Sequence, residues 1–371
     1  MIPRYQRLRL ELDAYLAHLP IGAKIMTEHQ LADKFSVSRV TARKALEQLR
    51  QDGTLISVPG RGTFLEKTVV HSRNGAAKSQ FIALLVPSGQ TTKIGEIIEG
   101  AEKTAAQRGY QMVISHDHDD PKLQIAQLRK LALTQVAGIM LFPDRFVSER
   151  AEFLALLEDL KRRNLPVVLL DRYLPNLDLP CVMTDNVQGM YELTEHLICC
   201  GRRRLALLGF WASNTVHMAR RKGFIEALRD HKLPSHPVKE GNIPGAKDFF
   251  RAAHDVVAGW VAGKTAAELP FDAIVCMFDL LAYGAYTALQ AVGLRVPEDV
   301  ALVGYDNLDS EMYRTMGLEL TSVQQPLAAE GSAAAELLID LVEGKSNGRR
   351  SSHVLLPPKL VVRTSCGSAL Q

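Results

Sequence analysis

The sequence lacks the long apolar runs of a membrane protein. No stretch approaches about 18 uncharged apolar residues, the length that a membrane-spanning helix requires. The first 20 residues carry Arg4, Arg7, Arg9, Glu11 and Asp13 and contain no apolar core, so we expect no secretory signal peptide. We therefore expect a cytoplasmic protein that does not enter a membrane.

Cysteine is scarce, and the few cysteines form no familiar framework. They lie mostly within apolar runs, which is typical of buried free thiols in a reducing cytoplasm. Cys199 and Cys200 lack the spaced Cys or His partners of a zinc site, and we interpret the His116–Asp120 run as a solvated loop. We therefore expect no metal. The cysteines are Cys181, Cys199, Cys200, Cys276 and Cys366.

Fingerprints of catalysis and of cofactor binding are also missing. The chain has no GxxxxGK phosphate loop, no GxGxxG dinucleotide motif, and no Ser/His/Asp or paired-carboxylate signature. We therefore expect neither an enzyme nor a cofactor. With 47% hydrophobic and 23% charged residues over 371 positions, the composition indicates an ordinary globular protein of two or three domains.

The positive charge of the chain is concentrated near its N-terminus. Residues 1–68 hold 11 Lys+Arg and 7 Asp+Glu, a net charge of +4, whereas the other 303 residues hold 33 and 34, a net charge of −1. A basic head on a nearly neutral chain is typical of a domain that binds nucleic acid.

Residues 22–67 have the order of elements of a winged helix-turn-helix. Thr27 and Gln30 have the spacing of a capping box at the start of one helix. Ser38 is the candidate N-cap of a second helix, which ends near Asp52-Gly53. Two strands, Thr54–Val58 and Gly62–Leu65, follow it. The apolar stripe of the second helix comprises Ala42, Ala45, Leu46 and Leu49.

The second helix has the chemistry of a major-groove reader. Its first turn, with Ser38, Arg39 and Thr41, offers backbone amides to phosphate and a guanidinium to guanine. Val40 suits a thymine methyl. Arg43 and Lys44 add cations on the polar side, and Arg61 lies at the tip of the turn between the strands. The alternative for these cations is a solvated helix face.

The motifs T-E-x-x-L-A, V-S-R-x-T-x-R-K-A-L and G-x-G-T-F, over residues 4–66, resemble the winged-helix head of the GntR regulator family. The resemblance implies that His29, Ser38, Arg39, Thr41, Arg43 and Gly60 contact DNA. The chain departs from the family at Met26, where proline is usual, and at His29, where arginine is frequent. We expect a DNA-binding domain over residues 1–67.

A polar stretch, residues 68–80, has the composition of a flexible linker. From residue 81 to residue 371, continuous apolar strands alternate with helices, which predicts an α/β domain with two doubly wound parallel sheets. Ligands of such folds bind beyond the carboxyl ends of strands. The residues that we select there as effector ligands are Gln90, Thr91, Lys93, Asp171, Arg220, Phe278 and Asp306.

Residues 81–366 resemble the effector domain of the LacI/GalR family, which is related to periplasmic sugar-binding proteins. The motifs include VVLLDR, ARRKGFIEAL, VGYDN and LTSVQQPLAAEGSAAAELL. The resemblance implies that Arg220 and Asp306 bind the effector; their alternatives are a surface cation and a turn cap. The family usually has Asn where this chain has Phe278. We expect lobe one to cover approximately 81–183 plus 325–347, and lobe two approximately 184–322 plus 350–366.

A GntR-like head on a LacI-like sensor resembles the AraR subfamily of sugar-responsive repressors. We expect a cytoplasmic homodimer that binds double-stranded operator DNA and is released by a small effector, a carbohydrate. The same build could sense a purine or nucleoside, with Phe278 stacking on the base. An enzyme, or a structural DNA-binding protein without an effector, fits the sequence less well.

Overall fold

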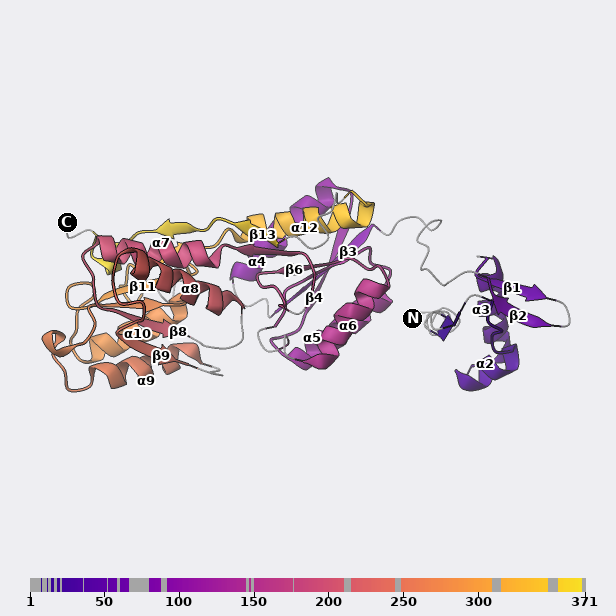
Figure 1. The fold of residues 1–371 in the computed structure, drawn as a ribbon, viewed down its shortest axis with the longest axis horizontal. Helices are drawn as coiled ribbons and strands as arrows, with labels where there is room; N and C mark the ends of the chain where they lie inside the picture. Colours follow the sequence, from indigo (N-terminus) through magenta and orange to yellow (C-terminus); the bar gives the residue numbers. More distant parts are fainter. Residues whose placement is uncertain are drawn as a thin grey trace.

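The structure is a computed structural model in which two sheet-based lobes follow a small N-terminal head (Figure 1). The Thr68–Gln80 linker lies outside the described residues except for Gln80, as do Gly60, Gln90 and Thr91. The described residues are 8, 12, 15–16, 19–20, 22–35, 37–51, 53–58, 61–66, 80–87, 92–144, 147, 150–175, 177–209, 215–243, 248–308, 315–345 and 353–368.

The head is a winged helix-turn-helix, as the sequence predicts. The capping box is present: Thr27 Oγ1 accepts from the amide of Gln30, and the Gln30 side chain accepts from the amide of Thr27. Ser38 Oγ accepts from the amide of Thr41, 3.2 Å away. The elements are α2 (Glu28–Lys34), α3 (Arg39–Gln51), β1 (Leu55–Val58) and β2 (Gly62–Leu65), with β1 and β2 antiparallel.

The core of the head is aliphatic. The expected stripe of α3 is buried, and it packs on side chains from α2, from the wing strands and from the N-terminal segment. Burying this stripe fixes which side of α3 faces outward. The buried residues include Leu8, Leu12, Leu16, Leu31, Ala42, Ala45, Leu46, Leu49 and Leu65.

Lobe one contains a parallel sheet covered by helices on both faces. Alternate residues of the first strand of this lobe enter different cores: Ile82 and Leu84 pack with the helices at 92–107 and 327–343, whereas Ala83 and Leu85 pack with those at 121–133 and 151–162. The sheet order is β13 (His353–Leu356), β7 (Cys181–Thr184), β6 (Val167–Leu170), β5 (Ile139–Leu141), β3 (Phe81–Val86) and β4 (Gln111–His116); the helices are α4 (Thr92–Gln107), α5 (Pro121–Leu133), α6 (Ala151–Arg162) and α12 (Leu327–Glu343).

Lobe two has a second six-stranded sheet, parallel except for its edge strand β14. Helix α7 packs against α8, and α9 packs against α10. The sheet order is β14 (Lys359–Val361), β12 (Thr321–Gln324), β11 (Ala301–Tyr305), β10 (Ala273–Cys276), β8 (Leu205–Gly209) and β9 (Lys239–Asn242); the helices are α7 (Asn186–Cys199), α8 (Thr215–Asp230), α9 (Phe249–Val261) and α10 (Asp279–Ala291), with short 3-10 turns η1 (Ala266–Glu268) and η3 (Thr364–Cys366).

The chain passes between the lobes three times. It crosses after β7 at Asp185, after β12 at residues 325–326, and between β13 and β14 at residues 357–358. The expected lobe boundaries are wrong for the last strands: His353–Leu356 pairs with β7 of lobe one, and only the residues after the third crossing join lobe two. The first and third crossings are joined by a hydrogen bond of 2.8 Å from Asp185 N to Leu356 O.

Helices α4 and α12 approach each other through glycine. A Cβ atom at Gly100 would lie 1.9 Å from Ala328 O, and one at Gly331 would lie 2.0 Å from Ile97 O. Larger residues at these positions would separate the two helices. The close packing holds α12, which begins at the second crossing, firmly on lobe one. No helix among the described residues is long and apolar enough to cross a membrane.

Candidate effector pocket and DNA interface

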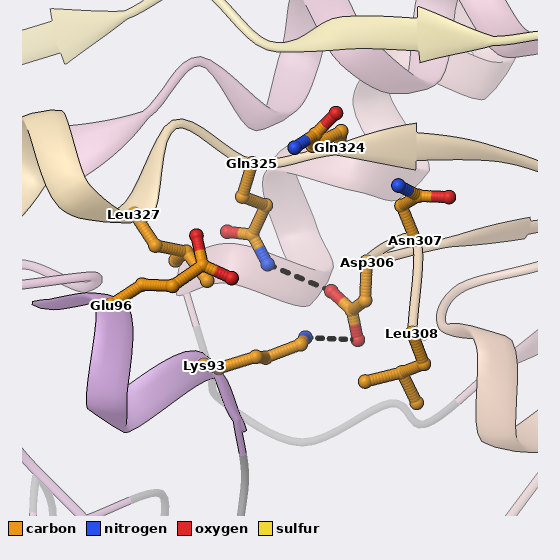
Figure 2. A pocket seen from close by; sticks show the side chains of 8 residues that line it. All are labelled: Lys93, Glu96, Asp306, Asn307, Leu308, Gln324, Gln325 and Leu327. Carbon is orange, nitrogen blue, oxygen red and sulfur yellow. Dashed lines mark hydrogen bonds and ion pairs between the residues drawn. The ribbon is translucent and has the colours of Figure 1, made fainter. Parts of the chain in front are cut away.

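A cavity of about 250 Å³ lies where the lobes meet at the second crossing. Figure 2 shows that three of its polar side chains point toward one another: Lys93 from α4 of lobe one, Asp306 from the segment after β11 of lobe two, and Gln325 from the crossing itself. Its lining is mainly polar. The lining residues are Lys93, Glu96, Asp306, Asn307, Leu308, Gln324, Gln325 and Leu327.

Asp306 is the polar centre of this pocket. It follows β11 directly and has a φ of 114°, a backbone conformation that non-glycine residues rarely adopt and that often marks a functional position. Lys93 Nζ lies 2.5 Å from its Oδ2, Gln325 Nε2 donates to its Oδ1 at 2.7 Å, and Arg220 lies 3.5 Å from Oδ1. Cations from both lobes therefore converge on one carboxylate.

Arg220 is held rigidly in lobe two. Its side chain is buried, Nε donates to Asn186 Oδ1 at 2.8 Å, and Nη1 donates to Met277 O at 2.5 Å. The guanidinium lies 3.7 Å from the ring centroid of Tyr305, in a cation–π contact. The surface-cation alternative for Arg220 is therefore wrong. Only its Nη2 is directed at Asp306, so the orientation of this donor is set before any ligand arrives.

Phe278 belongs to an aromatic group beside the pocket. It precedes α10, stacks on the ring of His217 at a centroid distance of 6.2 Å, and meets the edge of Phe249 at 5.2 Å. It directly follows Met277, whose carbonyl anchors Arg220. The phenyl ring is half-buried, packs against the core of lobe two, and does not itself line the cavity.

Asp171 is not gathered into the same cluster. It has a φ of 67° after β6, and its carboxylate is paired with Arg172 at 2.6 Å. It does not line the cavity. Of the seven effector ligands that the sequence suggests, the structure brings together Lys93, Arg220 and Asp306; Phe278 lies alongside, and Gln90 and Thr91 lie outside the described residues.

Sequence reasoning missed Gln325, which connects the pocket to a buried carboxyl group. Gln325 Oε1 lies 3.1 Å from the hydroxyl of Thr184, and the same hydroxyl is hydrogen-bonded to Oε1 of Glu330 in α12. Gln325 follows β12 directly, so the strand-end rule that selects Asp306 would also have selected it. No local sequence pattern identifies Glu330, because its raised pKa results from burial in the folded chain.

Two buried carboxyl groups near the pocket have raised pKa values. Burial, together with the negative charge of Asp171, raises the pKa of Glu330 to about 8; burial, together with Asp306, raises the pKa of Asp279 to about 7. Glu330 Oε2 has no hydrogen-bond partner among the described residues, whereas Asp279 accepts from Ser322 Oγ and Leu308 N. A neutral Glu330 is therefore favoured at the second crossing at neutral pH.

The polar side of α3 is exposed and basic. Arg39, Arg43 and Lys44 are exposed, and the side chain of Val40 is 77% exposed at the second position of the helix. A large aliphatic side chain left in water at a helix N-terminus is consistent with an apolar contact to DNA. The polar side of α3 thus has the composition that the sequence predicts.

Several side chains that we expect to contact DNA are paired with neighbouring side chains in the structure. Arg43 Nε lies 3.2 Å from Glu47, and His29 Nδ1 lies 3.3 Å from Asp33. Ser38 Oγ and Thr41 Oγ1 lie 2.8 Å apart at the N-terminus of α3. Exposed pairs of this kind are weak and exchange readily for phosphate. Arg61 is exposed in the turn between β1 and β2, and Gly60 lies outside the described residues.

Comparison with known proteins agrees with both parts of the architecture. Residues 79–364 match the periplasmic binding proteins and sugar binding domain of the LacI family, and residues 5–65 match the gntR family of bacterial regulatory proteins. The chain is 28% identical over 367 residues to the arabinose metabolism transcriptional repressor of Geobacillus stearothermophilus, with 98% of both chains covered.

Other relatives share the C-terminal part. The HTH-type transcriptional repressor PurR of Klebsiella pneumoniae is 29% identical over 291 residues, which are 76% of this chain and 79% of that repressor. The solved structure of a LacI-family transcriptional regulator from Sanguibacter keddieii matches with a TM-score of 0.62 at 26% identity, covering 79% of this chain and 100% of that one.

The raised pKa of Glu330 predicts how stability changes with pH. The folded state binds this proton more tightly than the unfolded state, so the contribution of Glu330 to the free energy of unfolding is complete below about pH 4.5 and is lost as pH rises toward about 8. Glu330→Gln keeps an acceptor for Thr184 and remains neutral. Urea denaturation of this variant should show a smaller fall between pH 5 and pH 8 than the unsubstituted chain shows.

A matched control is Glu102→Gln, at an exposed position of α4. This variant should retain the pH dependence of the unsubstituted chain. If Glu330→Gln and the unsubstituted chain lose stability equally over this pH range, the assignment of a neutral buried carboxyl group is wrong.

Proposed function

We propose that this chain is a repressor that is released from its operator by a sugar bound between the two lobes. The chain belongs to the family of periplasmic binding proteins and LacI-type sugar-binding domains, and it carries a gntR-family head. It is a DNA-binding transcription regulator rather than an enzyme. The observation that carries the proposal is the convergence of Lys93, Arg220 and Gln325 on Asp306. Each of these groups can exchange its present partner for a hydroxyl.

The chemistry of the pocket suits vicinal hydroxyl groups. A carboxylate accepts from two hydroxyls at once, while a guanidinium and an ammonium donate to their oxygens. A sugar ring has one apolar face, and the phenyl ring of Phe278 could pack against that face. The cavity of about 250 Å³ lies just below the usual volume of small-molecule pockets. This volume favours a monosaccharide, and the full-length relative named for arabinose metabolism makes an aldopentose the first candidate.

A purine or nucleoside is the second candidate. It is favoured by the aromatic pair Phe278 and His217, which could hold a base, and by the similarity of the C-terminal part to repressors named PurR. A nucleoside, however, has fewer adjacent hydroxyls for Asp306 and Lys93 to bind. A panel that contains both classes of ligand separates the two candidates.

We infer that effector binding changes the angle between the lobes. In the structure, Lys93 of lobe one contacts Asp306 of lobe two, so this ion pair spans the pocket. A sugar that inserts between the two side chains replaces the direct contact by one that passes through the ligand. The ligand then favours whichever lobe arrangement accommodates it, to the extent of its differential affinity. The resulting coupling to DNA binding is about 1–3 kcal/mol.

We propose that the repressor acts as a homodimer in the cytoplasm. Helix-turn-helix proteins commonly read two half-sites about 34 Å apart, one on each head. A change of lobe angle alters the spacing of two heads more than it alters one head alone. Release of DNA then follows from a mismatch between the heads and the half-sites, while the contacts of each head remain intact.

Arg39→Ala should weaken operator binding by about 1–3 kcal/mol, because the first turn of α3 presents this exposed guanidinium to the base edges. A gel-shift titration at fixed salt measures the change. Arg129→Ala, which removes an exposed arginine of lobe one, is the matched control and should leave operator affinity unchanged. If the Arg39 variant and the unsubstituted chain bind the operator with equal affinity, Arg39 does not contribute to the DNA interface.

Asp306→Ala should abolish binding of the effector, so that added effector no longer weakens operator binding by this variant. The substitution removes the acceptor that both cations orient. Calorimetry with aldopentoses, aldohexoses and nucleosides identifies the ligand of the unsubstituted chain and then tests the variant. Asp299→Ala, at a carboxylate paired with Arg295 in the same lobe, is the control and should bind normally.

If the Asp306 variant binds the same ligand as tightly as the unsubstituted chain, the pocket is not the effector site. If only nucleosides bind, and their binding depends on Asp306, the proposed site is correct but the proposed ligand class, a sugar, is wrong.

A further inference from the structure

Three side chains with metal-binding atoms meet at the far end of α7. His196 and Cys200 lie four residues apart, on one face at the C-terminal end of the helix, and Cys366 is supplied by η3 near the C-terminus. One ligand atom of each residue lies within 4.8 Å of the others. It is the one such group of at least three His, Cys, Asp or Glu side chains among the residues that the structure describes.

The distances within this Cys–His cluster (His196, Cys200 and Cys366) are close to those of a metal centre. His196 Nε2 lies 3.2 Å from Cys366 Sγ and 3.6 Å from Cys200 Sγ. For tetrahedral zinc, Zn–N of about 2.05 Å and Zn–S of about 2.3 Å place nitrogen and sulfur about 3.6 Å apart, and two sulfurs about 3.8 Å apart. The two nitrogen–sulfur distances are therefore within about 0.4 Å of those in a zinc centre, and the sulfur–sulfur distance is at most 4.8 Å.

Two thiol sulfurs lie within reach of one imidazole nitrogen in this cluster, and a neutral imidazole offers a single acceptor lone pair at Nε2. The Cys366 thiol has a second acceptor in Arg363 O, 3.2 Å away, so hydrogen bonds can satisfy the metal-free cluster. A cation placed between the three atoms uses the nitrogen lone pair and one lone pair of each thiolate. When Cys366 is deprotonated, Ser368 Oγ, 3.2 Å from its sulfur, can turn its hydroxyl to donate to the thiolate.

We propose that this cluster is a binding site for a thiophilic cation, with Zn²⁺ as the best match. Two thiolates and one imidazole are soft and borderline ligands that select zinc over magnesium or calcium. The two thiolate charges balance the dication. Cys366 is buried whereas His196 and Cys200 are half-buried, so the ion would be reached from the solvent side and would keep one position for water.

The site is separate from the effector pocket. Asn186, which holds Arg220, begins α7, whereas the cluster is at the other end of this 14-residue helix, roughly 20 Å away. Bound zinc joins α7 to the C-terminal turn, which packs on β11 and β12 of lobe two. It would therefore stabilise lobe two without occupying the position of the sugar.

Metal titration of the full, untagged chain, kept reduced with a phosphine and freed of metal with a chelator, tests the proposal. Co²⁺ should bind with one equivalent and produce a thiolate charge-transfer band and the visible bands of tetrahedral cobalt, and Zn²⁺ should displace it. Zinc at about 100 times its dissociation constant should raise the melting temperature by roughly 5–10 °C.

The neighbouring thiol supplies the control. Cys200→Ser and Cys366→Ser should each lose the cobalt bands and weaken zinc binding by more than about 100-fold, the upper end of what loss of an outer-shell partner costs. Cys199→Ser, at the exposed adjacent position, should bind normally. Melting of the metal-free variants confirms that they are folded.

Three results would overturn the proposal. They are the absence of cobalt bands in the reduced chain, bands that survive both Cys200→Ser and Cys366→Ser, and a Cys200–Cys366 disulfide in a protein whose reduced form binds no metal. The last result would show that the two sulfurs come together for oxidation.

Discussion

The carboxylate of Asp306 receives a cation from each lobe and an amide from the chain segment between them. Its backbone has a left-handed φ of 114°, and its partners come from α4, α8 and the end of β12. A carboxylate that is nearly buried must be paired, because an uncompensated charge is costly away from water. We propose that the relative position of the lobes depends on which groups pair with Asp306, and that a ligand changes that position by taking their place.

The same pocket is connected to the fold around it by hydrogen bonds. Gln325 donates to Asp306 and accepts from Thr184, and the Thr184 hydroxyl is also hydrogen-bonded to Glu330. Thr184 ends the strand before the first crossing, and Gln325 forms part of the second. The network thus joins the proposed ligand site to two of the three segments that connect the lobes. Glu330 is held on lobe one by the close glycine contacts of α12 with α4. We propose that a change in the pocket alters the angle between the lobes through these hydrogen bonds and helix contacts.

The sequence predicts the fold well where the signal is local. Capping at Thr27, the stripe of α3 and the alternation of buried strands all depend on residues a few positions apart, and the structure confirms them. Arg220 and Asp306 follow from a family resemblance and from their place beyond strands, and the structure brings them together. The assignment of His353–Leu356 to lobe two is wrong, because the partner of an edge strand depends on where the chain crosses between the lobes. The burial of Glu330 and the meeting of Cys366 with α7 depend on contacts more than 100 residues apart along the chain, which spacing rules do not cover.

The central claim is that occupation of the interlobe pocket and binding of the operator are coupled through the chain. Calorimetric titration of the effector into the free chain and into the chain saturated with operator DNA tests this claim most directly. We expect the operator to weaken effector binding by the same factor by which the effector weakens operator binding, about 5- to 150-fold for a coupling of 1–3 kcal/mol. Equal effector affinities in the two titrations, for a ligand whose binding depends on Asp306, would contradict the account.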